Sequence, residues 1–292
     1  MSTELIHAIG MAVVNGISSL AGIAGNTLVL VILFRNKGYF HGVNVFIGAL
    51  AITDLMVCII VQPVFIYLLF GSLTANTLKA FDKSVFAVMI QMSLNILLCI
   101  AISRFLEITH PFFYRSFATT SRIVIVILVV SVISTAQGIL FNTVSSMEVA
   151  EPFFQYATIA IFLLIYGRLY LIARKHRNEI ICQSRSLAYN HGPTGKRFAR
   201  LRNSTITTAI ITGTFVICFL PFSIVNMLDN EHAEEEDEYE SVRFWVSTIV
   251  SSSSSLNAYI YALRSPNFKN AITKELQAKC CCKKTTFISK NE

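Results

Sequence analysis

Seven long apolar runs divide the chain of 292 residues, and they constrain its fold more than any other feature. A helix needs about 20 mainly apolar residues to cross the hydrocarbon core of a membrane. Charged residues make up only 14% of the chain, whereas a soluble domain carries about 25%. The sequence therefore predicts an all-α membrane protein, built as a bundle of seven transmembrane helices. The predicted spans cover roughly residues 8–34, 43–70, 80–107, 121–144, 153–175, 203–228 and 242–263.

The lysines and arginines predict the orientation of this bundle. Of the 24, only Lys79, Lys83 and Arg243 fall on one side of the predicted membrane. Because connectors rich in Lys and Arg stay in the cytoplasm, the N-terminus is predicted outside and the C-terminus inside. Residues 1–7 then form a short extracellular N-terminus, and residues 8–264 form the bundle. The longest connector on the basic side, 176–202, contains a helix breaker at Gly192-Pro193.

The net charge of +7 does not predict nucleic-acid binding. The basic residues alternate with the apolar runs, and no basic run is interleaved with aromatic residues that stack on bases. The lipid membrane is the predicted partner instead. Near the C-terminus, Cys280, Cys281 and Cys282 are flanked by lysines, which indicates palmitoylation at an inner leaflet. No structural disulfide is predicted from the other cysteines.

Polar side chains inside the predicted spans need an explanation, because an unpaired polar group in hydrocarbon costs several kcal/mol. The most informative are Asn26, Asp54 and Asn257. An ionised Asp54 would need a cation, water or several hydrogen-bond donors. The serine run 251–255 has a simpler interpretation, because serine hydroxyls can bond to carbonyls of their own helix.

The third apolar run ends in Ser103-Arg104-Phe105, and Pro111 follows seven residues after the arginine. This spacing resembles the Asp-Arg-Tyr motif of rhodopsin-like (class A) G protein-coupled receptors. Further motifs resemble the same family in order along the chain: Gly25-Asn26, Leu50-Ala51-Ile52-Thr53-Asp54, Tyr166, Cys218-Phe219-Leu220-Pro221 and Asn257-Ala258-Tyr259-Ile260-Tyr261. Residues 262–269 resemble the approach to the family's eighth helix, which implies an amphipathic helix at 265–278 and a cytoplasmic tail at 279–292.

The resemblance implies a plasma-membrane receptor in which an extracellular ligand biases a two-state bundle toward activating a heterotrimeric G protein. The implied coupling and switch residues are Arg104, Ser103, Tyr166, Asn257, Tyr261, Phe219 and Pro221. Pro221 would supply the hinge, because it removes one backbone hydrogen bond from its helix. The implied sodium and water pocket consists of Asn26, Asp54, Ser93, Ser253 and Asn257. A sodium ion on Asp54 is the one metal expected, and no other cofactor is expected.

Departures from the family pattern affect the expected signalling. The arginine of the family is usually held by a neighbouring carboxylate, but Ser103 supplies none, and Leu201 replaces an acid at the inner end of the sixth helix. A charge-assisted bond of about 1.5–3 kcal/mol is therefore expected to be missing from the resting state. This predicts high basal signalling. The loss of proline after Asn257 acts in the opposite direction, because a straighter seventh helix switches less readily.

The ligand class stays open at this point. Amine receptors of the family place an aspartate where this chain has Phe86, and no lysine between Ser241 and Tyr261 can form a retinal Schiff base. The lack of the usual outer cysteine pair resembles the branch of melanocortin, adenosine, cannabinoid and lysophospholipid receptors. Lipid, nucleoside and peptide ligands all fit this branch. The expected ligand pocket consists of Asp82, Phe86, Ile90, Phe222 and Asn226.

Two other kinds of protein compete with the receptor reading. A small transporter or channel would also explain Asp54, although it predicts further charges along a pore. A degenerate receptor that does not couple would explain Ser103, Phe219 and Ala258. An enzyme is not predicted, because the sequence shows neither paired intramembrane carboxylates nor a nucleophile motif.

Overall fold

The computed structural model describes residues 3–36, 38, 40–70, 76–143, 150–186, 193–228, 236–264 and 269. Several predicted features lie outside this description. They are the palmitoylation site at Cys280, Cys281 and Cys282, the side chains of Asp82 and Leu201, and the eighth helix apart from residue 269.

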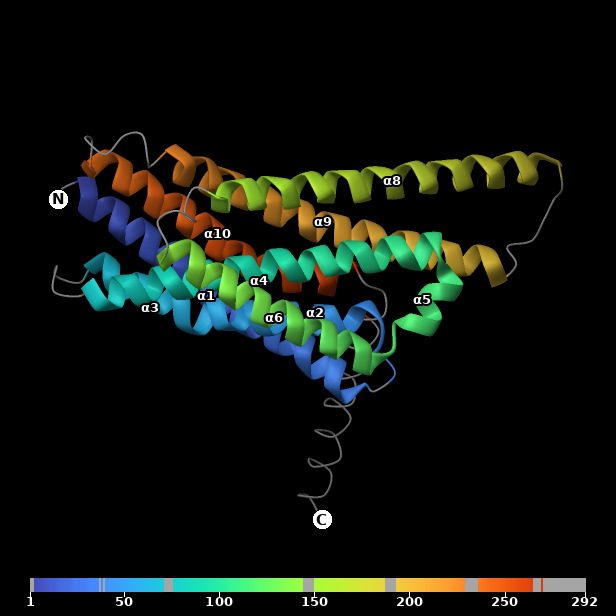
Figure 1. Ribbon diagram of the computed structural model, residues 1–292, viewed down its shortest axis with the longest axis horizontal. Helices are drawn as coiled ribbons and strands as arrows, with labels where there is room; N and C mark the ends of the chain where they lie inside the picture. Colours follow the sequence, from blue (N-terminus) through green and yellow to red (C-terminus); the bar gives the residue numbers. More distant parts are fainter. Residues whose placement is uncertain are drawn as a thin grey trace, which may run out of the picture.

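The described residues form helices joined by short connectors (Figure 1). One span is continuous through α2, a π-helical turn η2 and α3, and the π turn lies just before Pro63, which has no N–H to donate. The short α5 begins with Pro111, a position where the missing N–H costs nothing. The elements are α1 (Thr3–Arg35), α2 (Val43–Met56), η2 (Val57–Val61), α3 (Gln62–Phe70), α4 (Asn76–Thr109), α5 (Pro111–Phe117), α6 (Thr120–Thr143), α8 (Ala150–Ser186), α9 (Pro193–Leu228) and α10 (Glu236–Arg264).

Six helical segments of the described chain are long and apolar enough to cross a membrane. They are Glu4–Arg35, Val43–Phe70, Ser84–Thr109, Thr120–Phe141, Ala150–Ile172 and Asn203–Met227. The seventh predicted span lies in α10, which carries five consecutive serines and does not reach the same apolarity. It nevertheless packs within the bundle, against α1 and α9. The sequence prediction of an all-helical bundle is thus confirmed.

The helices α8 and α9 are longer than the predicted spans. Both continue into the polar connector 176–202, up to Ser186 and from Pro193 onward, and they extend past the end of α4 in Figure 1. The Arg, Lys, Glu and Gln residues of this stretch are good helix formers, so the helices do not need a lipid environment to continue. The predicted break at Pro193 agrees with the start of α9.

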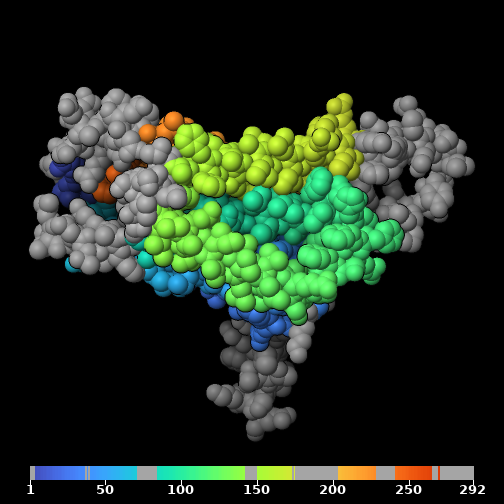
Figure 2. All heavy atoms as spheres, in the orientation of Figure 1, coloured from blue at the N-terminus to red at the C-terminus, as the bar shows by residue number. Residues whose placement is uncertain are grey.

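The core of the bundle lies around α4, whose Leu94, Leu97 and Ala101 are fully buried. The outer surface of the bundle carries exposed apolar side chains. Among them are Val132 of α6 and Leu163 of α8, which are 71% and 70% exposed. Figure 2 shows α4, α6 and α8 side by side on one such face. Exposed apolar side chains over whole helices are expected when lipid, not water, is the solvent.

Candidate functional site

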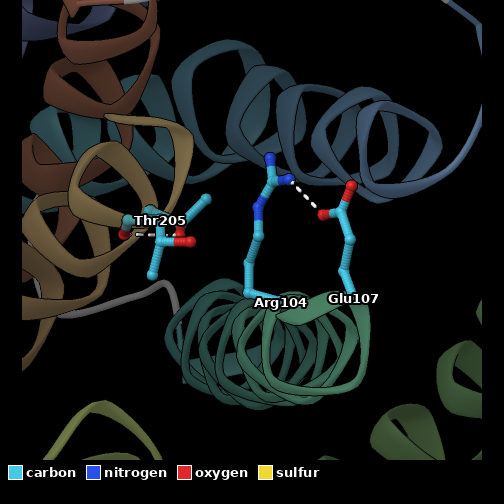
Figure 3. A network of polar contacts seen from close by, with 4 residues as sticks. Arg104, Glu107 and Thr205 are labelled. Atoms are coloured by element: carbon cyan, nitrogen blue, oxygen red, sulfur yellow. Dashed lines mark hydrogen bonds and ion pairs between the residues drawn. The ribbon is translucent and has the colours of Figure 1, made fainter. Parts of the chain in front are cut away.

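Arg104 is buried near the end of α4, even though it carries a charge. Its Nη1 donates a hydrogen bond to Glu107 Oε2 at 2.7 Å, an ion pair between residues three positions apart on one helix (Figure 3). The prediction that Arg104 lacks a carboxylate partner is therefore wrong. The sequence already indicated this ion pair, because Arg104 and Glu107 are three positions apart and therefore face the same side of a helix. The prediction considered only the preceding residue and the sixth helix.

Two predicted tyrosines lie around Arg104. The Tyr166 hydroxyl on α8 forms a hydrogen bond of 3.0 Å with Thr212 Oγ1 on α9. Tyr261 on α10 is buried, and both phenols lie within electrostatic range of the Arg104 guanidinium. The structure thus brings Arg104, Tyr166 and Tyr261 from three helices to one end of the bundle, here called the Arg104 end.

Tyr114 of α5 also belongs to the Arg104 end, although it was not among the predicted site residues. Burial raises the pKa of its phenol to about 12, the negative charge of Glu107 adds to this increase, and Arg104 and Ser103 act against it. The phenol stays neutral at physiological pH as a result. The phenol of Tyr114 thus lies near the ion pair at the end of α4.

A second predicted cluster lies deep in the bundle around Asp54, which is 1% exposed. Asn257 Nδ2 donates to Asp54 Oδ2 at 3.0 Å, joining α10 to α2. Asn26 Nδ2 donates to the carbonyl of Ser254 at 3.2 Å, joining α1 to α10. Ser93 is also buried, whereas the Ser253 hydroxyl donates at 2.7 Å to the carbonyl of Val250 in its own helix.

One observation indicates that this cluster could hold a small cation. Among the described residues, Asp54 Oδ1 and Asn257 Oδ1 are buried oxygens with no hydrogen-bond partner, although Ser254 lies near the carboxylate. Oxygen atoms without donors suit a hard cation, and a buried carboxylate needs a positive charge near it. Asp54 and Asn257 are therefore the residues that would hold sodium.

Of the expected ligand-pocket residues, Phe86 of α4 and Phe222 of α9 are in contact. The rings of Phe86 and Phe222 pack edge to face with centroids 5.4 Å apart, and Phe219 lies 5.9 Å from Phe222. Phe219 is fully buried and Ile90 is buried beside this cluster, whereas Asn226 is partly exposed. Pro221 lies inside α9 next to these aromatic residues, as the sequence predicted.

The structure also contains a buried polar network that the sequence reasoning missed. Asn15 Nδ2 of α1 donates to Thr248 Oγ1 of α10 at 3.0 Å, and Gln62 Nε2 of α3 donates to Ser18 Oγ at 2.7 Å. The sequence indicated such a network, because Asn15 and Gln62 are amide side chains inside apolar runs. The argument that singled out Asp54 applies to them as well.

A second missed network joins α4 to α6. Gln91 Nε2 and Asn95 Nδ2 both donate to Gln137 Oε1, at 3.2 Å and 3.0 Å. Asn95 Nδ2 also donates to Ser134 Oγ at 2.9 Å. Side-chain amides that bond across helices hold membrane bundles together.

Comparison with known proteins places these observations in a family. A model of the family described as 7 transmembrane receptor (rhodopsin family) matches residues 25–261. The chain is 24% identical to the human alpha-1A adrenergic receptor, over 96% of this chain and 70% of the receptor. It is 25% identical to melanocortin receptor 4 of Danio rerio, over 97% and 84% of the two chains. It is also 25% identical to adenosine receptor A2b of Gallus gallus, over 93% and 89%.

Proposed function

The chain belongs to the rhodopsin family of seven-transmembrane receptors, and we propose that it transduces an extracellular ligand into nucleotide exchange on a heterotrimeric G protein. It is a multi-pass membrane receptor and not an enzyme. The observation that carries the proposal is the buried Arg104, surrounded by phenols from α8 and α10 at one end of the bundle. A charged side chain buried in a membrane bundle is, by default, a candidate functional residue.

The orientation follows from the distribution of charge. The exposed Arg115 and Arg122 lie in α5 and at the start of α6, directly after the Arg104 end of α4. Because most basic residues of the sequence fall on this side, we place the Arg104 end in the cytoplasm and the N-terminus outside. A G protein would then meet Arg104 directly.

Switching would use the proline of α9. Pro221 removes one hydrogen bond from the helix backbone and so allows the two halves of α9 to move relative to each other. The Tyr166–Thr212 bond joins α8 to the half of α9 nearer the Arg104 end. Ligand contacts at Phe222 would therefore be linked, through α9, to the surroundings of Arg104.

The ligand is proposed to be largely apolar. Phe86, Ile90 and Phe222 offer ring faces and aliphatic surface, which suit a lipid or an aromatic molecule. The relatives bear names of adrenergic, melanocortin and adenosine receptors at almost equal identity, so similarity alone selects no ligand. Asp82 and Asn226 stay proposed as polar contacts.

The test is nucleotide exchange with purified components. The receptor in lipid nanodiscs is mixed with G proteins of each class, and uptake of a non-hydrolysable GTP analogue is followed with a panel of lipid, nucleoside and peptide ligands. The proposal expects uptake above that of receptor-free discs for at least one G protein. Uptake equal to receptor-free discs throughout, with folded receptor, would contradict it and favour a non-coupling receptor, whereas ion flux into liposomes would favour a channel.

The sodium site yields a separate prediction. We expect NaCl to raise the thermal unfolding midpoint of the receptor above its value in choline chloride of equal ionic strength, by roughly 2–4 °C for each kcal/mol of binding. Asp54→Asn should abolish this difference, because the amide carries no charge to attract the ion. Glu107→Gln, which removes a carboxylate at the Arg104 end, is the matched control and should keep it. A sodium effect that survives in Asp54→Asn would exclude the site.

A further inference from the structure

We propose that the turn between α5 and α6 binds an anionic phospholipid of the inner leaflet, with Arg122 on the lipid phosphate and the rings of Phe113 and Phe117 among the headgroups. These three residues are called the lipid corner. The lipid is a partner other than the ligand and the G protein, and the receptor would bind it whether or not it couples. The leaflet follows from the orientation proposed above, which places this end of the bundle at the cytoplasm.

The backbone of the lipid corner is well defined. Only Ala118 and Thr119 separate α5 from α6. The Thr119 N–H donates to the carbonyl of Phe117 at 2.8 Å, and the Ile123 N–H donates to the carbonyl of Thr119 at 3.0 Å. Tyr114 and Ala118, four residues apart and therefore on one face of the chain, pack against the core of the bundle. The turn is thus fixed on its inner side and presents its other side outward.

The outward side carries a pair of aromatic rings. Phe113 and Phe117 are four residues apart on α5, and their side chains are 57% and 47% exposed. The rings are stacked, with centroids 5.5 Å apart and an angle of 9° between their planes. Two exposed rings in contact form an apolar patch, and such patches mark interaction sites. A membrane beside the patch offers it an environment away from water.

Arg122 of α6 joins this aromatic pair. Its Cζ lies 5.6 Å from the centroid of the Phe117 ring, in a cation–π contact. Its Nη1 also donates to the carbonyl of Ser116 at 3.3 Å. These two contacts hold an exposed side chain beside the rings. Because the guanidinium has five N–H donors in a planar fork that matches a phosphate, most of its donors are left for a lipid headgroup.

The position of Arg122 on α6 places it beside lipid. Arg122, Ile125, Val129 and Val132 follow one another at helical spacing and therefore share one face of α6. The three apolar residues are 58%, 53% and 71% exposed, within a segment apolar enough to cross a membrane. Such a face contacts lipid chains. Arg122 lies one turn before Ile125, at the end of this face, where the headgroups of the same lipids lie.

The charges around the lipid corner select an anionic lipid. Residues 110–125 contain no Asp or Glu, and the nearby Glu107 is already paired with Arg104. An anionic headgroup therefore meets no carboxylate within this segment, whereas a zwitterionic headgroup brings its own cation and gains less from Arg122. Arg115 is also exposed, but it lies two residues from each ring on α5 and so faces another side of that helix. Arg122 is thus the arginine that a lipid beside the rings would meet.

The experiment places a fluorescent reporter in the lipid corner. Trp245 is the single tryptophan of the chain, so Trp245→Phe combined with Phe113→Trp leaves one indole, beside Phe117. The full receptor is assembled in phosphatidylcholine nanodiscs that contain a minor fraction of either phosphatidylserine or phosphatidylcholine with brominated acyl chains, which quench an indole that they touch. We expect brominated phosphatidylserine to compete for the site about 5-fold better than brominated phosphatidylcholine, the preference that one arginine at a membrane surface provides.

Two matched variants in the same background test the role of Arg122. Arg122→Gln should remove the preference for phosphatidylserine, whereas Arg115→Gln removes an equal charge from the neighbouring helix and should keep the preference. A preference that survives Arg122→Gln, or that falls equally in both variants, would overturn the proposal, because the attraction would then be diffuse. Equal quenching by the two lipids before either arginine is replaced would overturn it as well.

A protein contact is the competing use of the exposed rings. Fluorescence that responds to an added G protein but is quenched by neither brominated lipid would assign the rings to that contact and would overturn the proposal. If Phe113→Trp does not give folded receptor, Phe117→Trp in the Trp245→Phe background places the indole at the other ring and gives the same comparison. Quenching selective for phosphatidylserine in either reporter, lost in Arg122→Gln and kept in Arg115→Gln, supports it.

Discussion

Replacing Gly138 with alanine is expected to lower the thermal unfolding midpoint of the receptor by roughly 6–10 °C, corresponding to about 3 kcal/mol of overpacking. A Cβ at Gly138 would lie 2.6 Å from Val88 Cγ2, 2.7 Å from Val88 Cα and 2.9 Å from Val88 N. Two of these three atoms belong to the backbone, so a change of rotamer cannot relieve the clash. The helices α4 and α6 would have to move apart.

Separation of α4 from α6 would also break the amide network between them. Gln137 Oε1 accepts hydrogen bonds from Gln91 and Asn95, which lie on the neighbouring helix. In hydrocarbon no water replaces these bonds, so each lost bond adds to the cost of the clash. A larger residue than alanine at position 138 is expected to prevent accumulation of folded receptor.

Thermal denaturation of purified receptor in detergent checks this expectation. Gly213→Ala is the matched control, because a Cβ at Gly213 meets no atom within 4 Å and alanine favours the helix. Its unfolding midpoint should match that of the wild type or slightly exceed it. Equal midpoints for Gly138→Ala and Gly213→Ala would show that α4 and α6 do not approach as closely as described.

The sequence predicted the bundle well because apolar runs are set by the thickness of a membrane and not by tertiary detail. The family resemblance also implied that Asp54 and Asn257 share one pocket, and a hydrogen bond joins the two side chains. Reasoning from the sequence missed the amides Asn15, Gln62 and Gln137, because they are neutral and were not counted with the charged residue. The close approach at Gly138 was not predictable either, because it depends on which faces of two helices meet.

The partner of Arg104 shows a different limit of prediction from the sequence. The motif resemblance fixed attention on Ser103, where the family usually has an acid, and so predicted an unrestrained arginine. The helix places Glu107 on the same face one turn later, and the ion pair forms there instead. The prediction of high basal signalling therefore loses one of the two observations on which it rested. The motif predicts which residue switches, whereas the local helix geometry decides what holds it.

Arg104→Ala is expected to reduce nucleotide exchange on the G protein to the receptor-free rate, at least a 10-fold loss. The guanidinium presents five donors in a planar fork, and it is buried within electrostatic range of Tyr166 on α8 and Tyr261 on α10. Alanine removes every contact that this group can make with the G protein. Arg104→Lys keeps the charge but not the fork, so it should restore only part of the exchange.

Folding and coupling must be separated in this test. Arg104→Ala leaves Glu107 without its partner, but that carboxylate is 26% exposed and water can solvate it, so the thermal unfolding midpoint should shift by no more than roughly 2 °C. Arg168→Ala, which removes an exposed arginine from α8, is the matched control and should keep exchange near the wild-type rate. Exchange in Arg104→Ala equal to that in Arg168→Ala would contradict the role of Arg104, because the receptor would then couple without the guanidinium that is buried at the Arg104 end.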